Sequence, residues 1–201
     1  MKTFCFDFDG TVADTLPLVI KTVDRLLKKS GEEEISEDLL RKIRSEGIED
    51  VFQEMRVPVY KLFFLYIKIK KEMNAGITDV TVREEVKEVL KKLKREGNTL
   101  GILTSNSREN VEDFLERNNL KIFDFVNTSG VLGKEREIKK LKKKGGIFVY
   151  VGDEVRDIVA GRRAKVKTVA VSWGLNSREA LLRARPDILI EEPKDLLELS
   201  F

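Results

Sequence analysis

The chain contains 201 residues, of which 41% are hydrophobic and 36% are charged, and it has four prolines. This composition excludes a disordered chain, and the length suits one substantial domain with a small inserted one. Its 38 basic and 35 acidic residues leave a formal charge of +3, which gives no reason to expect nucleic acid or membrane binding.

The only cysteine, Cys5, lies in an apolar run and has no partner for an intrachain disulfide, which fits a reducing compartment. The longest apolar runs are shorter than the roughly 20 residues that cross a bilayer. The first residues, MKTFCFDFDG, contain acids where a signal peptide needs an uninterrupted apolar region. We therefore expect a cytoplasmic protein with no membrane partner.

Short strand-like runs alternate with helix-like patterns along most of the chain. The expected strands are residues 3–8, 99–104, 147–151, 168–171 and 187–190. Residues 82–96 and 108–118 carry apolar side chains at helical spacing. Gly97 ends the first of these helices, and Ser107 or a neighbour caps the second. The alternation predicts an α/β fold with a mainly parallel sheet covered by helices.

Residues 16–77 interrupt the alternation, because they read as successive helices without a clear strand. We expect residues 16–78 to form a small helical insertion, and residues 1–15 and 79–201 to form the main domain. The segment VPVYKLFFLYIKIKKEM is the most apolar part of the insertion, and we interpret it as a core helix rather than a substrate-lining one.

The first expected strand ends in the segment FCFDFDGTVADT, where two acids are separated by one residue. Side chains alternate along a strand, so Asp7 and Asp9 are expected to share a face. The carboxyl edge of a parallel sheet is where α/β proteins bind ligands, and adjacent carboxylates need a bound cation or a shared proton. The alternative is a strand that simply ends in an Asp-Gly turn.

A second acidic pair follows the strand at residues 147–151, in the segment YVGDEVRD. Asp153 leaves the strand and Asp157 lies one helical turn further on, so both can face one site. Mg²⁺ prefers oxygen ligands of this kind. A helix cap is the other reading of Asp153, and the two roles are compatible.

Polar residues also follow the strand at residues 99–104, in the segment GILTSNS. Thr104, Ser105 and Asn106 reach the same sheet edge at the start of a helix, where hydroxyls and free amides suit a phosphate anion. A capping cluster without a ligand explains this segment equally well.

The lysine runs KKLKR and KKLKKK belong to amphipathic helices and are interpreted as solvated faces rather than nucleic-acid contacts. In VLGKEREIKK, Lys134 is the candidate to neutralise a phosphate and an attacking carboxylate, with Lys139 and Lys140 as less favoured alternatives. Three basic residues of the insertion are interpreted as solvated surface rather than contacts to an anionic substrate: Arg44, Arg56 and Lys61.

Together, DFDGT at 7–11, LTSNS at 103–107, GK at 133–134 and GDEVRD at 152–157 resemble the haloacid dehalogenase-like hydrolase superfamily in order and spacing. DGTVADT and GDEVRDIVAGRRAKVKTVAVSWG resemble its phosphoglycolate phosphatase-like branch. The resemblance implies a Rossmann-like three-layer sandwich with a small α-helical cap inserted after the first strand. It also implies an Mg²⁺-dependent phosphatase acting on a small phosphorylated metabolite, such as a phosphoglycolate-like or sugar phosphate monoester.

The resemblance further implies a role for each matched residue. Asp7 is the nucleophile that becomes phosphorylated, and Asp9 is the general acid and then the general base. Mg²⁺ is held by Asp7, by the backbone carbonyl of Asp9 and by Asp153, and Asp157 assists without binding the ion directly. Residues that contact the phosphate follow from the same motifs: Gly10, Thr11, Thr104, Ser105, Asn106 and Lys134. The motif GKERE lacks the proline that follows this lysine in many relatives, so Lys139 and Lys140 stay open.

Other function classes share parts of this pattern. A phosphomutase of the same superfamily forms the same aspartyl phosphate, and the sequence does not separate it from a phosphatase. A non-enzymatic, receiver-type signalling domain also combines acids, a hydroxyl residue and a lysine, but it needs no helical insertion and lacks the Asp-x-Asp pair. Members that cleave carbon–halogen bonds differ at the position of Asp9. Either a monomer or a homodimer fits the sequence.

Overall fold

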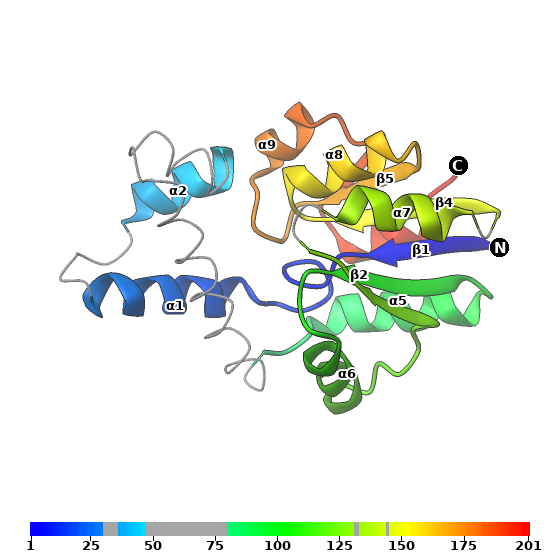
Figure 1. Cartoon of the computed structure of the whole chain (residues 1–201), viewed down its shortest axis with the longest axis horizontal. Helices are drawn as coiled ribbons and strands as arrows, with labels where there is room; N and C mark the ends of the chain where they lie inside the picture. Colours follow the sequence, from blue (N-terminus) through cyan, green and yellow to red (C-terminus); the bar gives the residue numbers. More distant parts are fainter. Residues whose placement is uncertain (30–35, 47–79, 131–132, 144) are drawn as a thin grey trace.

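The protein is described by a computed structural model, which covers residues 1–29, 36–46, 80–130, 133–143 and 145–201 (Figure 1). Within these residues, a six-stranded sheet has the strand order β3-β2-β1-β4-β5-β6, and its neighbouring strands are parallel. The strands are β1 (Lys2–Phe6), β2 (Thr99–Thr104), β3 (Phe125–Thr128), β4 (Ile147–Gly152), β5 (Lys167–Val171) and β6 (Ile188–Ile190).

Helices cover both faces of the sheet. One face carries α5 (Glu84–Arg95), α6 (Arg108–Arg117) and the short 3₁₀ helix η2 (Pro193–Leu197), and the other carries α7 (Lys134–Lys142), α8 (Val155–Arg163) and α9 (Arg178–Arg183). Alternation along β1 joins the two layers, because Phe4 and Phe6 pack with α5 and α6 whereas Cys5 packs with α7 and α8. The predicted α/β three-layer sandwich with a parallel sheet is confirmed.

The sequence missed one strand and placed several ends imprecisely. β3 was not predicted, because FVNT is short and only partly buried, so it lacks the continuous apolar run of a central strand. β1 ends at Phe6 rather than at residue 8, although the amide of Asp7 still donates to the carbonyl of Val151 at 2.8 Å. Ser107 caps α6 as predicted, since its hydroxyl accepts from the amide of Asn110 at 3.2 Å.

The segment predicted as a helical insertion contains α1 (Leu16–Lys29) and α2 (Glu37–Glu46). Both lie beyond the end of the sheet toward which the strands point, and α2 packs against α9 (Figure 1). The apolar segment at 57–73, Arg56 and Lys61 lie outside the described residues. The division into a core and a cap at 16–78 therefore stays a prediction.

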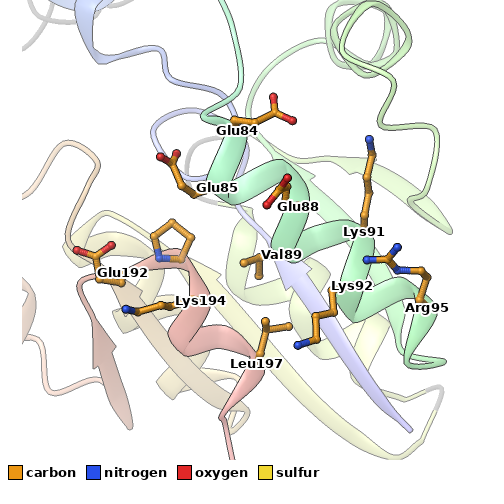
Figure 2. Close-up of a pocket in the computed structure, with 11 residues that line it drawn as sticks. Glu84, Glu85, Glu88, Val89, Lys91, Lys92, Arg95, Glu192, Lys194 and Leu197 are labelled. Carbon is orange, nitrogen blue, oxygen red and sulfur yellow. The ribbon is translucent and has the colours of Figure 1, made fainter.

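None of the helices in the described ranges is long and apolar enough to cross a membrane. A groove of about 560 Å³ runs between α5 and η2 (Figure 2). Its lining mixes acids such as Glu84 and Glu88 with bases such as Lys91 and Arg95. This groove lies on the opposite face of the sheet from α7 and α8, so it is separate from the acidic motifs described next.

Candidate active site

Asp7 stands at the carboxyl end of the central strand β1. It directly follows β1, and the residue is only 3% exposed. Alternation along the strand places Asp7 with Cys5, on the face covered by α7 and α8. The carboxylate of Asp7 therefore lies on the side of the sheet that also carries Lys134, at the start of α7, and the GDEVRD motif, at the start of α8.

Lys134 is the first residue of α7, and its side chain is buried between two acids. Its Nζ lies 2.9 Å from Oδ1 of Asp7 and 2.5 Å from Oδ1 of Asp157. Lys139 and Lys140 instead pair with glutamates on the exposed side of the same helix. Of these three lysines, the structure therefore brings only Lys134 to Asp7 and Asp157.

Asp157 is held at the start of α8 by its own helix. Its Oδ2 accepts from the amide of Glu154 at 3.2 Å, as the N3 member of a capping box. Gly152 leaves the space that this carboxylate fills, because a Cβ at position 152 would lie 2.6 Å from its Oδ2. The N-cap of α8 is Glu154, so Asp153 is not the helix cap that one reading of the sequence proposed.

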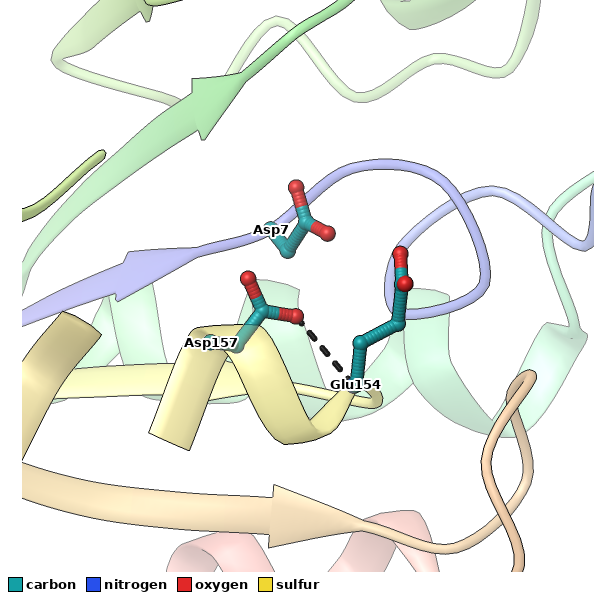
Figure 3. A group of neighbouring side chains, drawn as sticks. All are labelled: Asp7, Glu154 and Asp157. Atoms are coloured by element: carbon teal, nitrogen blue, oxygen red, sulfur yellow. Dashed lines mark hydrogen bonds between the residues drawn. The ribbon is translucent and has the colours of Figure 1, made fainter. Parts of the chain in front are cut away.

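Carboxylate oxygens of Asp7, Glu154 and Asp157 lie within 4.8 Å of one another (Figure 3). Glu154 was not among the residues expected at the site. Its only signal was its place inside GDEVRD, which is indistinguishable from an exposed acid in the first turn of a helix. The guanidinium of Arg156 donates to Oε1 of Glu154, so this acid is partly neutralised already.

Asp153 stands beside this group but is used differently. Its Oδ1 accepts from the hydroxyl of Thr11 at 2.7 Å, and its Oδ2 accepts from the amide of Leu175 at 2.7 Å. Gly10, at φ +77°, and Gly174 let two chain segments approach the carboxylate, since a Cβ at either position would lie 2.3 or 2.2 Å from Oδ2. Asp153 thereby joins the first motif to the loop after β5.

The turn after β2 contributes the third group of predicted residues. Thr104 is fully buried, and its Oγ1 accepts from the amide of Asn106 at 2.9 Å. Asn106 also donates from Nδ2 to Oδ2 of Asp9 at 3.4 Å, while its Oδ1 accepts from the amide of Ser107 at 2.8 Å. The segment therefore caps α6 and contacts the second acid of the first motif, and Ser105 lies in the same turn.

The amides of Gly10 and Thr11, expected to face a phosphate, donate within their own turn. They bond to the carbonyls of Ala13 at 2.9 Å and Phe8 at 3.3 Å, respectively. Trp173 holds the same turn from outside, since its Nε1 donates to the carbonyl of Thr11 at 3.2 Å. These contacts give the turn a defined shape, and the phosphate-binding role of its amides stays a prediction.

The electrostatics of the site show an excess of negative charge. Burial and the carboxylate of Asp157 raise the pKa of Asp7 to about 7, against the opposing effect of Lys134. Burial and the carboxylates of Glu154 and Asp7 raise the pKa of Asp153 well above its usual range. Burial lowers the pKa of an amine, yet Asp157 and Asp7 outweigh it and raise the pKa of Lys134. One lysine thus leaves part of the cluster uncompensated.

This donor set fits a hard divalent cation. Such ions take carboxylate and carbonyl oxygens, and the clustered oxygens of Asp7, Glu154 and Asp157 are of that type. A cation there would also relieve the repulsion that raises the pKa of Asp7.

Comparison with known proteins identifies the family of this chain. The model of the haloacid dehalogenase-like hydrolase family matches residues 4–171. The chain is 32% identical over 204 residues to phosphoglycolate phosphatase of Synechococcus elongatus, covering 98% of this chain and 96% of that protein. It is 28% identical over 209 residues to pyrophosphatase PpaX of Bacillus cereus (strain B4264), covering 99% and 96%, respectively.

Among solved structures, a haloacid dehalogenase-like family hydrolase from Streptococcus pneumoniae matches with a TM-score of 0.79 at 18% identity, covering 98% of this chain and 96% of that chain. This likeness concerns the fold. The prediction of a phosphohydrolase enzyme is confirmed by the family match and the curated relatives. The chain belongs to the haloacid dehalogenase-like hydrolase family.

Proposed function

We propose that this protein is an Mg²⁺-dependent phosphatase that hydrolyses a small phosphate monoester through an aspartyl phosphate on Asp7. The observation that carries the proposal is the buried Asp7 carboxylate at the end of β1, with Nζ of Lys134 at 2.9 Å and Asp157 behind that lysine. A nucleophilic carboxylate beside the fixed ammonium group of Lys134 suits phosphoryl transfer, because alignment and charge neutralisation do most of the catalysis.

In the first step, an oxygen of Asp7 attacks phosphorus and the bond from phosphorus to the leaving oxygen breaks. Asp9 donates a proton to that oxygen, so the product leaves as an alcohol. Lys134 remains against the developing negative charge, because its bond to Asp157 holds the ammonium in place.

In the second step, water attacks the phosphoryl group and the bond between phosphorus and the Asp7 oxygen breaks. Asp9, now ionised, takes a proton from the water, which releases inorganic phosphate and restores both acids. Asp9 is half-buried, and Asn106 donates from Nδ2 to its Oδ2, which helps to orient this carboxylate.

We assign the phosphate contacts to Lys134 and to the turn of Thr104, Ser105 and Asn106, with Gly10 and Thr11 on the side of the first motif. The support is that Asn106 links this turn to Asp9, which brings the ends of β1 and β2 together. The start of α6 also presents the amides and partial positive charge that suit an anion.

We assign the cation to Asp7, the backbone carbonyl of Asp9 and Asp153, with Asp157 assisting and Glu154 as an additional carboxylate. When bound, Mg²⁺ supplies positive charge to the phosphoryl oxygens. The support for Asp153 is that Thr11 and Leu175 each donate to its carboxylate and so fix its position.

The substrate class is proposed from the relatives as well as from the site. A phosphoglycolate phosphatase and a pyrophosphatase are both similar over nearly the whole chain. We infer a small phosphorylated metabolite and place phosphoglycolate-like and sugar phosphate monoesters ahead of pyrophosphate. The test compares kcat/KM for 2-phosphoglycolate, a hexose phosphate and inorganic pyrophosphate, each with Mg²⁺ and with excess chelator.

We expect chelator to abolish turnover and Asp7→Asn to reduce kcat by about 10⁴-fold or more, since the nucleophile is lost. Acid quenching of wild-type turnover should trap one phosphoryl group on the chain, and mass spectrometry should locate it on Asp7. Turnover that persists in Asp7→Asn or in chelator would contradict the mechanism, and a clear preference for pyrophosphate would contradict the substrate class alone.

A further inference from the structure

The loop at residues 173–177, which follows β5, contacts two parts of the protein that are distant in sequence. On one side it contacts the acidic motif at the start of α8, and on the other it contacts the end of α2. Among the described residues of this loop, Asn176 is the side chain that bonds to both, and it is only 3% exposed.

Toward the site, the loop holds the backbone and side chain of Asp153. The amide of Leu175 donates to Oδ2 of Asp153 at 2.7 Å, and the amide of Asn176 donates to its carbonyl at 3.3 Å. The side chain of Asn176 accepts from the amide of Val155 at 2.8 Å, which satisfies a donor in the first turn of α8. A shift of Asn176 therefore moves the groups that fix Asp153.

Toward α2, the loop binds the helix end at Arg44. Nδ2 of Asn176 donates to the carbonyl of Arg44 at 3.3 Å, and the amide of Ser177 donates to the same carbonyl at 2.7 Å. The guanidinium of Arg44 donates back to the carbonyl of Gly174 at 3.3 Å. Carbonyls in the last turn of a helix lack helical partners, so these donors complete the end of α2.

We propose that Asn176 is a positioning residue that couples docking of α2 to the placement of Asp153 in the active site. The proposal rests on the proposed function, because it assigns Asp153 to the cation site. The carboxamide suits this role because its oxygen accepts from α8 while its nitrogen donates to α2, and both bonds require one orientation. Undocking of α2 removes the acceptor that holds this orientation.

Coupling of this kind is reciprocal. If docked α2 favours the arrangement of Asp153 that binds Mg²⁺, then Mg²⁺ must favour docked α2 by the same factor. Factors of about 5-fold to about 150-fold are usual for coupled sites. The coupling can therefore be measured from either end, without substrate and without turnover.

The test uses the full chain and Mg²⁺ alone. Hydrogen exchange of the α2 amides is measured with and without Mg²⁺, and the Mg²⁺ dissociation constant is measured by calorimetry. In the wild type, we expect Mg²⁺ to slow exchange in α2 by about 5-fold or more. Asn176→Asp keeps an acceptor for Val155 but places a carboxylate oxygen against the carbonyl of Arg44. It should abolish the Mg²⁺-dependent slowing and weaken Mg²⁺ binding by a matching factor.

Arg183 offers a matched control, because its guanidinium donates to the carbonyl of Ser45 and so also ties α2 to the core, away from Asp153. Arg183→Ala should loosen α2 yet keep the Mg²⁺-dependent slowing. Arg44→Ala changes no fully buried side chain and should reduce the slowing even if Asn176→Asp folds poorly. For 2-phosphoglycolate at saturating Mg²⁺, Asn176→Asp should raise KM more than it lowers kcat.

The proposal is overturned if Mg²⁺ leaves α2 exchange unchanged in the wild type, or if Asn176→Asp and Arg44→Ala both keep the full slowing. It is also overturned if Arg183→Ala abolishes the slowing as completely as Asn176→Asp. Those outcomes leave the proposed function intact as long as Mg²⁺-dependent turnover is lost in Asp7→Asn. Turnover that is indifferent to Mg²⁺ would instead remove the proposed function and the coupling with it.

Discussion

Aspartates occupy both edges of the sheet, and the two edges use them in opposite ways. At the amino edge, Asp124 and Asp187 each precede an outer strand and bond to the strand beside it. At the carboxyl edge, Asp7 and Asp153 are buried next to other acids. The first pair accepts hydrogen bonds from strand amides, whereas burial and neighbouring acids raise the pKa of both members of the second pair.

The amino-edge acids occupy equivalent positions. Asp124 accepts from the amide of Leu100 at 2.8 Å at the β2–β3 junction, and Asp187 accepts from the amide of Thr168 at 2.9 Å at the β5–β6 junction. Burial opposes ionisation of Asp187, but these hydrogen bonds and Lys167 outweigh it and lower its pKa. Each carboxylate accepts from the amide one position before the first residue that pairs with the outer strand, which is Gly101 in β2 and Val169 in β5.

The carboxyl edge shows the reverse balance. Asp7 has a raised pKa because burial and Asp157 outweigh Lys134. A site that keeps several carboxylates close together lowers the stability of the fold, which is the usual relation between active sites and stability. The four predictions below separate these two kinds of acid.

Among these four, the largest effect is expected for Asp9, the proposed proton-transfer residue. Asp9→Asn should lower kcat by about 10²-fold to about 10⁴-fold, because the amide neither donates the proton nor accepts it from water. Steady-state kinetics on 2-phosphoglycolate would measure this loss, with circular dichroism as the control for folding. A variant with near-wild-type kcat would place the proton transfer on another group.

The next effect concerns Lys134 and compares two lysines of one helix. Lys134→Met leaves Asp7 and Asp157 facing each other without a cation and should lower the free energy of unfolding by about 3–5 kcal/mol. Lys139→Met removes an exposed pair with Glu135 and should leave the urea midpoint unchanged within error. Similar midpoints for both variants would contradict the buried charge cluster.

The third prediction is a smaller change in the free energy of unfolding, and its sign distinguishes the amino edge from the carboxyl edge. Asp187→Ala should lower the free energy of unfolding by about 1 kcal/mol. The loss is small because Asp187 is partly exposed, so water can accept from the amide of Thr168 in its place. Asp7→Asn should leave stability in chelator unchanged or raise it, because it removes a repelling buried charge. Urea titrations at neutral pH would measure both, and a loss of stability in Asp7→Asn would remove the contrast between the edges.

The last prediction concerns the pH dependence of stability without metal. The pKa of Asp7 rises from 3.8 to about 7 on folding, so the folded chain binds more protons and this group's stability contribution is lost as pH rises between these values. Asp187 has a lowered pKa, so its contribution is present above its usual pKa and is lost as pH falls. Asp7→Asn should remove the loss between these two pKa values, as urea midpoints in chelator would show, and an unchanged pH profile would contradict the raised pKa.

Much of this was readable in the sequence because it is local. Hydroxyls such as Ser107 mark helix starts, and the DFDGT and GDEVRD motifs indicate acids at strand ends. Lys134 could be nominated but not separated from Lys139 and Lys140, because the choice depends on which side of α7 faces β1.

The sequence by itself determined the parallel α/β sheet, the helical segment after β1 and the acids at the carboxyl edge, since these follow from periodicity and from contiguous motifs. Only the tertiary structure decided the strand β3, the place of Glu154 beside Asp7 and the two-sided bonding of Asn176. Each of these depends on contacts between segments far apart in the chain, where a short strand, a helix-start glutamate and a loop asparagine carry no distinguishing local pattern.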